Sequence, residues 1–175
     1  MKFVLFMQKQ NMTIKVKNKD TLEFDDFKFK CSIGKRGFAT KKIEGDFKTP
    51  KGQFKIDYLY FRDDKNRNIK TKLKKISIKR NMGWCNDTKN PQNYNKPIKL
   101  PNKLRHEKMF RKDSKYDLVI PIKYNYFKPV TGKGSAIFIH LTKNYKPTAG
   151  CIALKKEDFL ILLKLITKDT KIKIY

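Results

Sequence analysis

Cysteine and histidine are scarce in this chain of 175 residues, which contains three cysteines and two histidines. Cys31, Cys85 and Cys151 are too far apart for any two of them to have the spacing of metal ligands. At most one disulfide can form, and one thiol must stay free. The sequence therefore excludes a zinc module and a disulfide scaffold, and we expect neither a metal nor a cofactor.

Long apolar runs are also missing, because none approaches the roughly 18 residues of a membrane-spanning helix. The first residues, 1–7, have one charge followed by a short apolar stretch. This stretch is shorter than a signal-peptide core and has no small-residue cleavage site after it. We expect it to form a first strand, so the sequence shows no signal for export.

Acidic residues number only 16 against 43 lysines and arginines, which gives a formal net charge of +27. The positive residues extend from Lys2 to Lys173 and form no tail. Such a charge attracts polyanions, including anionic polymers of a cell envelope. Lysines scattered along every segment define no groove, and we find no nucleic-acid recognition motif. We therefore expect no specific nucleic-acid partner.

The apolar fraction of 39%, with 13 Phe and 8 Tyr, is enough for the core of a single domain over residues 1–175. Apolar and polar residues alternate in several short segments, as in strands with one buried face. Residues 156–167 predict the one helix, largely buried, with Glu157 and Asp158 at its positive N-terminal end. The fold class is mainly β with one packed α-helix. The expected strands are 12–17, 27–33, 54–60, a short one around Ile76 and Ile78, 118–122, 136–141 (buried on both faces) and 171–175.

The stretch from about residue 80 to residue 115 has no clear periodicity. It contains Pro91, Pro97 and Pro101, many asparagines, and the only tryptophan, Trp84. Long irregular loops are uncommon in compact domains and are often functional. We interpret this one as a lid or a substrate-binding wall.

The most informative residue is Cys151, which follows Gly150 in a predicted turn. His140 ends a predicted strand eleven residues earlier, so the two side chains can meet across one loop. A histidine beside a thiol makes it a nucleophile, and we expect an ion pair that lowers the thiol pKa. The alternative is a buried apolar cysteine and a structural histidine.

Sequence around these residues resembles the active-site signature of the L,D-transpeptidase catalytic-domain family, also called YkuD-like. The resemblance rests on Gly134–His140 (GSAIFIH) and Pro147–Leu154 (PTAGCIAL), and on Glu44–Phe54 (EGDFKTPKGQF) upstream. Further matches indicate a compact, single-domain branch of the family. They are Gly83-Trp84-Cys85, Tyr94-Asn95, His106-Glu107 and Tyr116-Asp117-Leu118-Val119.

The resemblance implies a β-sandwich-like fold and peptidoglycan stem peptides as substrate. It implies that Cys151 is the nucleophile, His140 the base and the backbone carbonyl of Leu141 the third member. The acyl group of one stem would pass to an amine of another stem. Such a substrate places the protein in the periplasm or cell envelope.

The sequence departs from the family pattern at Ala149, where many members have His, and at Ala153, where many have Arg. The interval from His140 to Cys151 is also shorter than usual. These differences leave open which stem-peptide bond is cut. Both a link between two third-position residues (3-3) and one from the first to the third (1-3) are compatible.

Several other residues are candidates for the site, each with a structural alternative. The backbone N–H of Gly150 is expected to stabilise an oxyanion, unless Gly150 serves only the turn. Arg36 is either a carboxylate clamp or a solvated turn residue. Trp84 and Tyr94 form either an aromatic substrate wall or a hydrophobic plug. His106 lines the site or lies on the surface, and Thr148 is assigned to substrate binding.

Two other functions remain open. With water as acceptor, the same acyl-enzyme gives an L,D-carboxypeptidase or endopeptidase. The more remote alternative is a basic protein that binds nucleic acid without catalysis.

Overall fold

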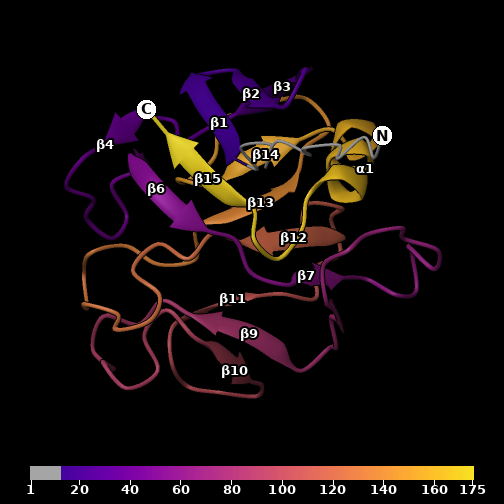
Figure 1. The fold of residues 1–175 in the computed structure, drawn as a ribbon. Coiled ribbons are helices and arrows are strands. Elements are labelled where there is room, and N and C mark those ends of the chain that lie inside the picture. Colours follow the sequence, from indigo (N-terminus) through magenta and orange to yellow (C-terminus); the bar gives the residue numbers. More distant parts are fainter. Residues whose placement is uncertain (1–12) are drawn as a thin grey trace, which may run out of the picture.

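The computed structural model describes residues 13–175, and the strand expected over residues 1–7 lies outside this range. The chain order is mainly strands with one late helix (Figure 1). The prediction of a mainly β fold with one packed α-helix is confirmed. The elements are β1 (Thr13–Asn18), β2 (Thr21–Phe24), β3 (Phe27–Ser32), β4 (Phe38–Ala39), β5 (Thr49–Pro50), β6 (Gly52–Lys55), β7 (Leu59–Phe61), β8 (Lys75–Ser77), β9 (Met82–Cys85), β10 (Pro97–Lys99), β11 (His106–Lys108), β12 (Leu118–Pro121), β13 (Phe138–Leu141), β14 (Ile152–Leu154), α1 (Lys156–Leu165) and β15 (Lys171–Ile174).

Ten strands form one curled sheet, in the order β6-β15-β1-β2-β3-β14-β13-β12-β7-β8. Near its centre is the parallel pair β13 and β14, in which every residue is buried. The continuous apolar run predicted such a strand, buried on both faces. This central pair positions the residues of the candidate site.

The two faces of β13 belong to different cores. Ile139 and Leu141 pack into the cluster that includes Phe159, Leu162 and Leu163 of α1. Phe138 faces the other way, into a second cluster with Trp84, Tyr116 and Cys151. Successive side chains of a strand point to opposite faces, so His140 is on the Phe138 side. The lower part of Figure 1 shows the short strands β9 to β11 on this side of the molecule.

The helix α1 ends at Leu165, two residues before the predicted end at Thr167, because Ile166 already has extended dihedrals. Glu157 and Asp158 occupy its first turn, as predicted. The helix is less buried than expected, since Ile161 is 37% exposed while Phe159 is fully buried. One face therefore packs on the sheet and the other meets solvent.

The stretch 80–115 is not irregular throughout, which corrects the sequence expectation. It contains a three-stranded antiparallel sheet in the order β10-β9-β11. Strands of three or four residues between prolines and asparagines are too short to show alternation. Their pairing partners, not their local pattern, make them strands.

Two strand predictions differ in detail from the structure. The expected strand 54–60 is two strands, β6 and β7, with only a single bridge at Ile56 between them. In β3, Phe29 and Cys31 are buried, but Phe27 at the strand end is 42% exposed. Alternation gives the face of each residue but not where the covering layer ends.

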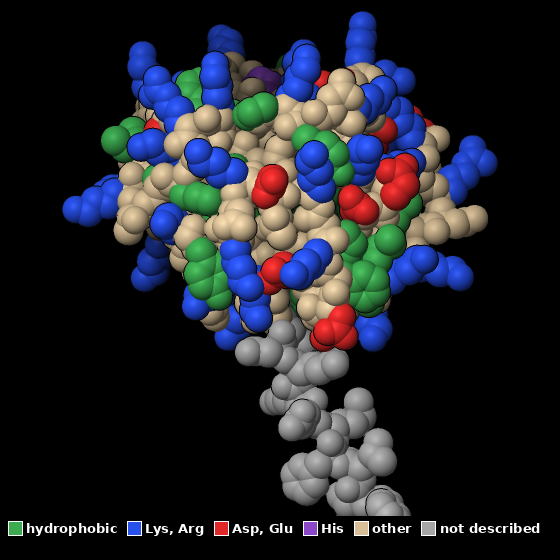
Figure 2. Space-filling model, turned by 90° about the horizontal axis from the view of Figure 1, so that it is seen from above, with side chains coloured by type: hydrophobic (Ala, Val, Ile, Leu, Met, Phe, Trp, Pro, Cys, Tyr) green, Lys and Arg blue, Asp and Glu red, His purple; other side chains and the backbone are tan. Residues whose placement is uncertain are grey.

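Lysine and arginine side chains are spread over the whole face seen in Figure 2, with acidic side chains between them. This face shows no single basic groove of the kind that tracks a nucleic-acid backbone. Among residues 13–175, no helix is long and apolar enough to cross a membrane.

Candidate active site

Cys151 lies directly before β14, at the point where the chain leaves the Gly150 turn and begins to pair with β13. Its sulfur donates a hydrogen bond to the carbonyl oxygen of Ala136 at 3.2 Å and accepts one from the backbone N–H of Phe138 at 3.4 Å. The residue is 8% exposed. The parallel pairing therefore fixes the thiol against the start of β13.

His140 lies two residues after Phe138 on β13, and its ring nitrogen Nδ1 is 2.9 Å from the carbonyl oxygen of Leu141. An N–H at Nδ1 donates to this carbonyl, which leaves Nε2 as the acceptor nitrogen. This is the contact that the family resemblance implies for Leu141. The edge of the Tyr116 ring packs against the imidazole at a centroid distance of 5.5 Å.

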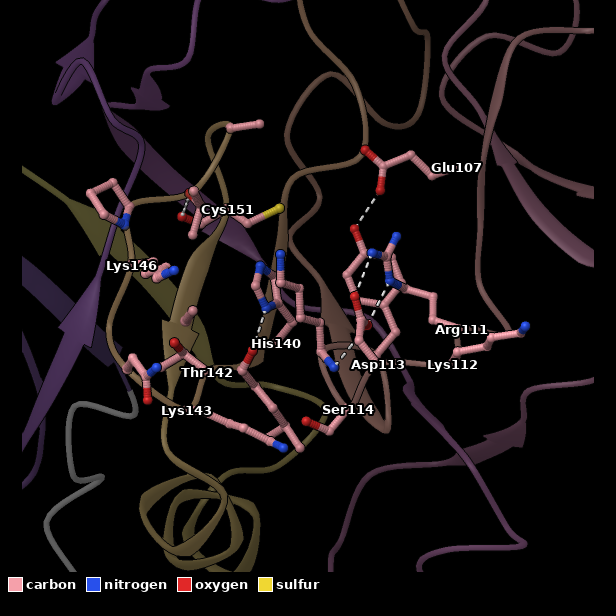
Figure 3. Close-up of a pocket in the computed structure, with 18 of the residues that line it drawn as sticks. Glu107, Arg111, Lys112, Asp113, Ser114, His140, Thr142, Lys143, Lys146 and Cys151 are labelled. Carbon is pink, nitrogen blue, oxygen red and sulfur yellow. Dashed lines mark hydrogen bonds and ion pairs between the residues drawn. The ribbon is translucent and has the colours of Figure 1, made fainter.

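Cys151 and His140 line the same cavity, of about 610 Å³, and both project into it in Figure 3. Thr148 and Ala149 form the rim on the turn side, and residues 111–116 form the opposite wall. The end of the 80–115 stretch thus contributes to this wall, together with Glu107. The cations that line the cavity are Lys65, Arg111, Lys112, Lys115, Lys143 and Lys146.

Burial keeps both members of the pair uncharged. It raises the pKa of the Cys151 thiol to about 12, and the negative charge of Glu107 adds to this, while the Phe138 N–H and Lys42 oppose it. Burial also lowers the pKa of His140 to about 4, although the Leu141 carbonyl opposes this. Both shifts favour the neutral pair over the expected thiolate–imidazolium pair in the resting site, because desolvation penalises both charges.

Gly150 has a φ of 142°, a conformation that side chains rarely adopt. A Cβ at this position would lie 2.8 Å from the carbonyl oxygen of Lys48. The Gly150 N–H donates to the hydroxyl of Thr148 at 3.0 Å, so it is already engaged. In the resting structure this N–H is therefore not free to bind an oxyanion, and the turn requires glycine for steric reasons.

Thr148 also donates its hydroxyl hydrogen to the carbonyl oxygen of Cys151 at 2.6 Å. Its backbone bridges to Gly34. Although Thr148 lines the cavity, its hydroxyl is engaged at both ends within the turn. Its role in the resting structure is to hold the turn before the cysteine.

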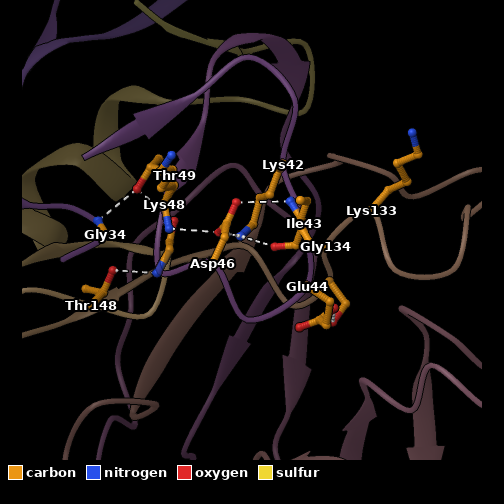
Figure 4. A network of polar contacts seen from close by, with 12 residues as sticks. Gly34, Lys42, Ile43, Glu44, Asp46, Lys48, Thr49, Lys133, Gly134 and Thr148 are labelled. Carbon is orange, nitrogen blue, oxygen red and sulfur yellow. Dashed lines mark hydrogen bonds and ion pairs between the residues drawn. The ribbon is translucent and has the colours of Figure 1, made fainter. Parts of the chain in front are cut away.

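A second threonine, Thr49, supports the same turn from a distant part of the chain. Its hydroxyl accepts from the Gly34 N–H and donates to the Gly150 carbonyl, both at 2.9 Å. Figure 4 shows Thr49 beside Gly34 and Thr148. The Thr-Pro element of the sequence, 101 residues before Gly150, is thereby tied to the turn that carries Cys151.

Asp46, which is partly buried, and the buried Lys42 form an ion pair behind the turn, with Lys42 Nζ 2.5 Å from Asp46 Oδ1 (Figure 4). The Asp46 carboxylate also accepts from the backbone N–H groups of Ile43 and Lys48. The Lys42 side chain packs under Gly134, and its charge favours the thiolate form of Cys151. Sequence reasoning missed Lys42, whose lack of a local pattern gives no signal.

Trp84 does not form a substrate wall, since it is 1% exposed and packs edge-on against Phe138. Its indole N–H donates to the side-chain oxygen of Asn95 at 2.9 Å. That oxygen also accepts from the Ala136 N–H at 3.0 Å. Trp84 thus helps to hold Ala136, whose φ is 51° and whose carbonyl accepts from Cys151.

Tyr94 is fully buried and likewise does not line the cavity. Its hydroxyl donates to Glu44 at 2.5 Å and accepts from the Gly134 N–H at 3.1 Å. Ser135 donates to the same Glu44 carboxylate at 2.7 Å. The aromatic-wall interpretation is wrong for both residues, which instead fix the loop before β13.

Arg36 and His106 also lie away from this cavity. Arg36 is in the turn after Gly34, and its N–H donates to the Phe47 carbonyl. His106 lines a different cavity, with Phe110 among its neighbours there, and its Nδ1 is 2.6 Å from the Leu104 carbonyl. Neither residue is among those that line the cavity of Cys151.

Cys31 and Cys85 are free and buried, as is Cys151. No group of three or more His, Cys, Asp or Glu side chains within residues 13–175 is arranged to hold a metal ion. The chemistry that the site offers is that of a thiol, an imidazole and a cation-rich cavity.

Solved structures give weak similarity. An L,D-transpeptidase from Mycobacterium smegmatis is 13% identical, with a TM-score of 0.41 over 93% of this chain and 58% of that one. The helical cell shape determining protein Pgp2 from Campylobacter jejuni is 19% identical, with a TM-score of 0.45 over 93% of this chain and 46% of that one. The chain thus spans about half the length of these proteins.

The comparison with curated proteins finds no match. The family model of the L,D-transpeptidase catalytic domain, YkuD, matches residues 3–174, which is nearly the whole chain. This match agrees with the resemblance read from the Cys151 and His140 segments. The chain therefore belongs to the L,D-transpeptidase catalytic-domain (YkuD) family.

Proposed function

We propose that the protein is a peptidoglycan L,D-transpeptidase that forms an acyl-enzyme on Cys151. The observation that carries the proposal is the placement of Cys151 and His140 in one cavity, with the imidazole oriented by the Leu141 carbonyl. A nucleophile, a base and a group that orients the base are the elements of acyl transfer. Residues 1–175 would act as one catalytic domain.

The first half-reaction starts from the neutral pair. The thiol turns from the Ala136 carbonyl toward His140, and Nε2 takes its proton as the sulfur attacks a carbonyl carbon of the donor stem peptide. The thioester forms, the peptide C–N bond breaks, and the imidazolium returns the proton to the leaving amine. The lowered pKa keeps the imidazole neutral at neutral pH, so Nε2 has a free lone pair, although the same shift makes His140 a weaker base.

The developing oxyanion needs N–H donors near Cys151. We assign this role to the N–H of Cys151 itself, because the N–H of Gly150 is held by Thr148 in the resting structure. Gly150 joins only if the Thr148 hydroxyl turns away when substrate binds.

The cations around the cavity suit a peptide that carries several carboxylates. Stem peptides have such carboxylates, and lysine and arginine side chains hold them by charge-assisted hydrogen bonds. Lys112 and Lys115 on one wall and Lys143 and Lys146 on the other are placed for this, whereas Arg111 is paired with Asp113. The substrate class puts the reaction in the cell envelope, where the net charge of +27 also favours anionic polymers.

The test is a digest of purified muropeptides followed by mass-resolved product analysis. Wild-type protein is expected to yield cross-linked dimers, and the masses of their fragments distinguish 3-3 from 1-3 links. Cys151→Ala and His140→Ala are each expected to lower turnover by roughly a thousandfold or more while retaining the fold. Near-normal turnover by either variant contradicts the assignment, and trimmed monomers alone show water as the acceptor.

A further inference from the structure

Glu107 lines the cavity of Cys151 but has no part in the first half-reaction. It is the middle residue of β11, and alternation along that strand sends His106 to the other cavity and Glu107 into the cavity of Cys151. Its carboxylate accepts a hydrogen bond from the buried hydroxyl of Tyr116. Figure 3 shows Glu107 on the wall across from the Cys151 sulfur.

The charge of Glu107 is not neutralised by an ion pair. The other carboxylate of the cavity, Asp113, is bound by Arg111 through two contacts of 2.7 and 2.9 Å. Within residues 13–175, no lysine or arginine nitrogen lies within ion-pair distance of Glu107. Glu107 thus makes no close ion pair, although its charge interacts with Arg111 at longer range, in a cavity otherwise rich in cations.

This carboxylate works against the nucleophile. Its charge disfavours the thiolate of Cys151, so it makes the first half-reaction harder. Donor carboxylates would also be repelled from it. A negative group in this position suits a positively charged ligand, and the second half-reaction has one, because an amine acceptor is an ammonium at neutral pH.

We propose that Glu107 is the acceptor-binding residue, which holds the ammonium group of the second stem peptide beside the thioester on Cys151. The inference rests on the proposed acyl-enzyme and adds the group that favours an amine over water. Tyr116 orients the Glu107 carboxylate, and the tyrosine hydroxyl fixes it on the cavity wall.

The attack of the acceptor amine on the thioester needs no further reagent. The bound ammonium gives one proton to the neutral imidazole of His140, and this proton leaves to water. The free amine attacks the thioester carbon, the new C–N bond forms and the C–S bond breaks. The second proton of the amine passes to the sulfur, which restores the thiol of Cys151.

The test measures how the acyl-enzyme divides between aminolysis and hydrolysis in Glu107→Gln. The glutamine keeps an oxygen that accepts from Tyr116, so the fold is expected to persist. The donor is a disaccharide-tetrapeptide, and two acceptors are compared. One is a stem tripeptide with a free side-chain amine, and the other is hydroxylamine, which is uncharged near neutral pH.

For the ammonium acceptor, the ratio of amide to hydrolysis product is expected to fall at least about tenfold in Glu107→Gln. For hydroxylamine the ratio is expected to stay unchanged, and the rate of acylation to stay equal or rise. Asp63→Asn, which removes an exposed carboxylate paired with Lys79 outside the cavity, is the control and is expected to leave both ratios unchanged.

An unchanged ratio with the ammonium acceptor overturns the inference, as does an equal fall with both acceptors, which marks a merely structural role. Wild-type protein that forms the acyl-enzyme but never yields an amide also overturns it, while the role of Cys151 stands. Wild-type protein that forms no acyl-enzyme refutes the proposed function itself, and the inference with it.

Discussion

The hydroxyl of Thr49 donates a hydrogen bond of 2.9 Å to the carbonyl oxygen of Gly150, directly before the candidate nucleophile. Thr49 is fully buried, and the same hydroxyl accepts from the Gly34 N–H. One side chain thus joins three segments that are far apart in sequence. The geometry at Cys151 depends on a residue that never touches the substrate cavity.

Replacement of Thr49 by valine keeps the shape of the side chain and removes both hydrogen bonds. Because it leaves a buried N–H and a buried carbonyl without this partner, the free energy of unfolding is expected to fall by about 1–3 kcal/mol. Denaturant unfolding measures this, and acylation of Cys151 is expected to slow as well. Thr49→Ser retains the hydroxyl and should lie close to wild type. Equal behaviour of the valine and serine variants contradicts the role of the hydroxyl.

Gly150→Ala places a Cβ 2.8 Å from the Lys48 carbonyl, at a backbone conformation that alanine disfavours. The turn must shift, and a displacement of about 1 Å at Cys151 is enough to slow catalysis on the order of 100-fold. Acylation kinetics measure this loss. Gly132→Ala is the control, since Gly132 has a φ of 80° but nothing near the added Cβ. Two alanine variants with the same activity would show that the close approach does not matter.

The low pKa of His140 predicts how stability depends on pH. The unfolded chain takes up a proton near pH 6.5, while burial makes the folded chain resist it until about pH 4. The unfolded state therefore binds more protons in this window, and the free energy of unfolding falls as the pH drops from about 6.5 to 4.

Denaturant unfolding of wild type and His140→Gln at several pH values tests this. The variant is expected to lack the loss between pH 6.5 and 4. Asp113, whose pKa is lowered to about 2 by Arg111, changes the free energy of unfolding in a separate pH window, below pH 3.8. Parallel curves for the two proteins between pH 6.5 and 4 would refute a buried, neutral imidazole.

Sequence alone located the central pair. The apolar run before His140 predicted a buried strand, and the glycine before Cys151 predicted the turn, so β13 and the start of β14 followed. The alternation in 171–175 likewise gave β15. These signals are local, and local patterns are what a sequence displays directly.

Other features depend on partners distant in the chain. The burial that makes Cys151 and His140 neutral comes from the packed layers on both sides of β13, and no residue pattern reports it. Because their stretch has no clear periodicity, the sequence leaves Trp84 and Tyr94 available to a ligand, but β9 and its neighbours enclose them. Glu107 was overlooked beside His106, since only the pairing of β11 decides which of the two faces the thiol.

The most direct test of Cys151 as the nucleophile is intact-mass analysis after exposure to a carbapenem, followed by peptide mapping. One adduct, located on Cys151, is expected in wild type and in Cys85→Ala, and none is expected in Cys151→Ala. Absence of an adduct in the wild type, or an adduct that persists in Cys151→Ala, would contradict Cys151 as the nucleophile.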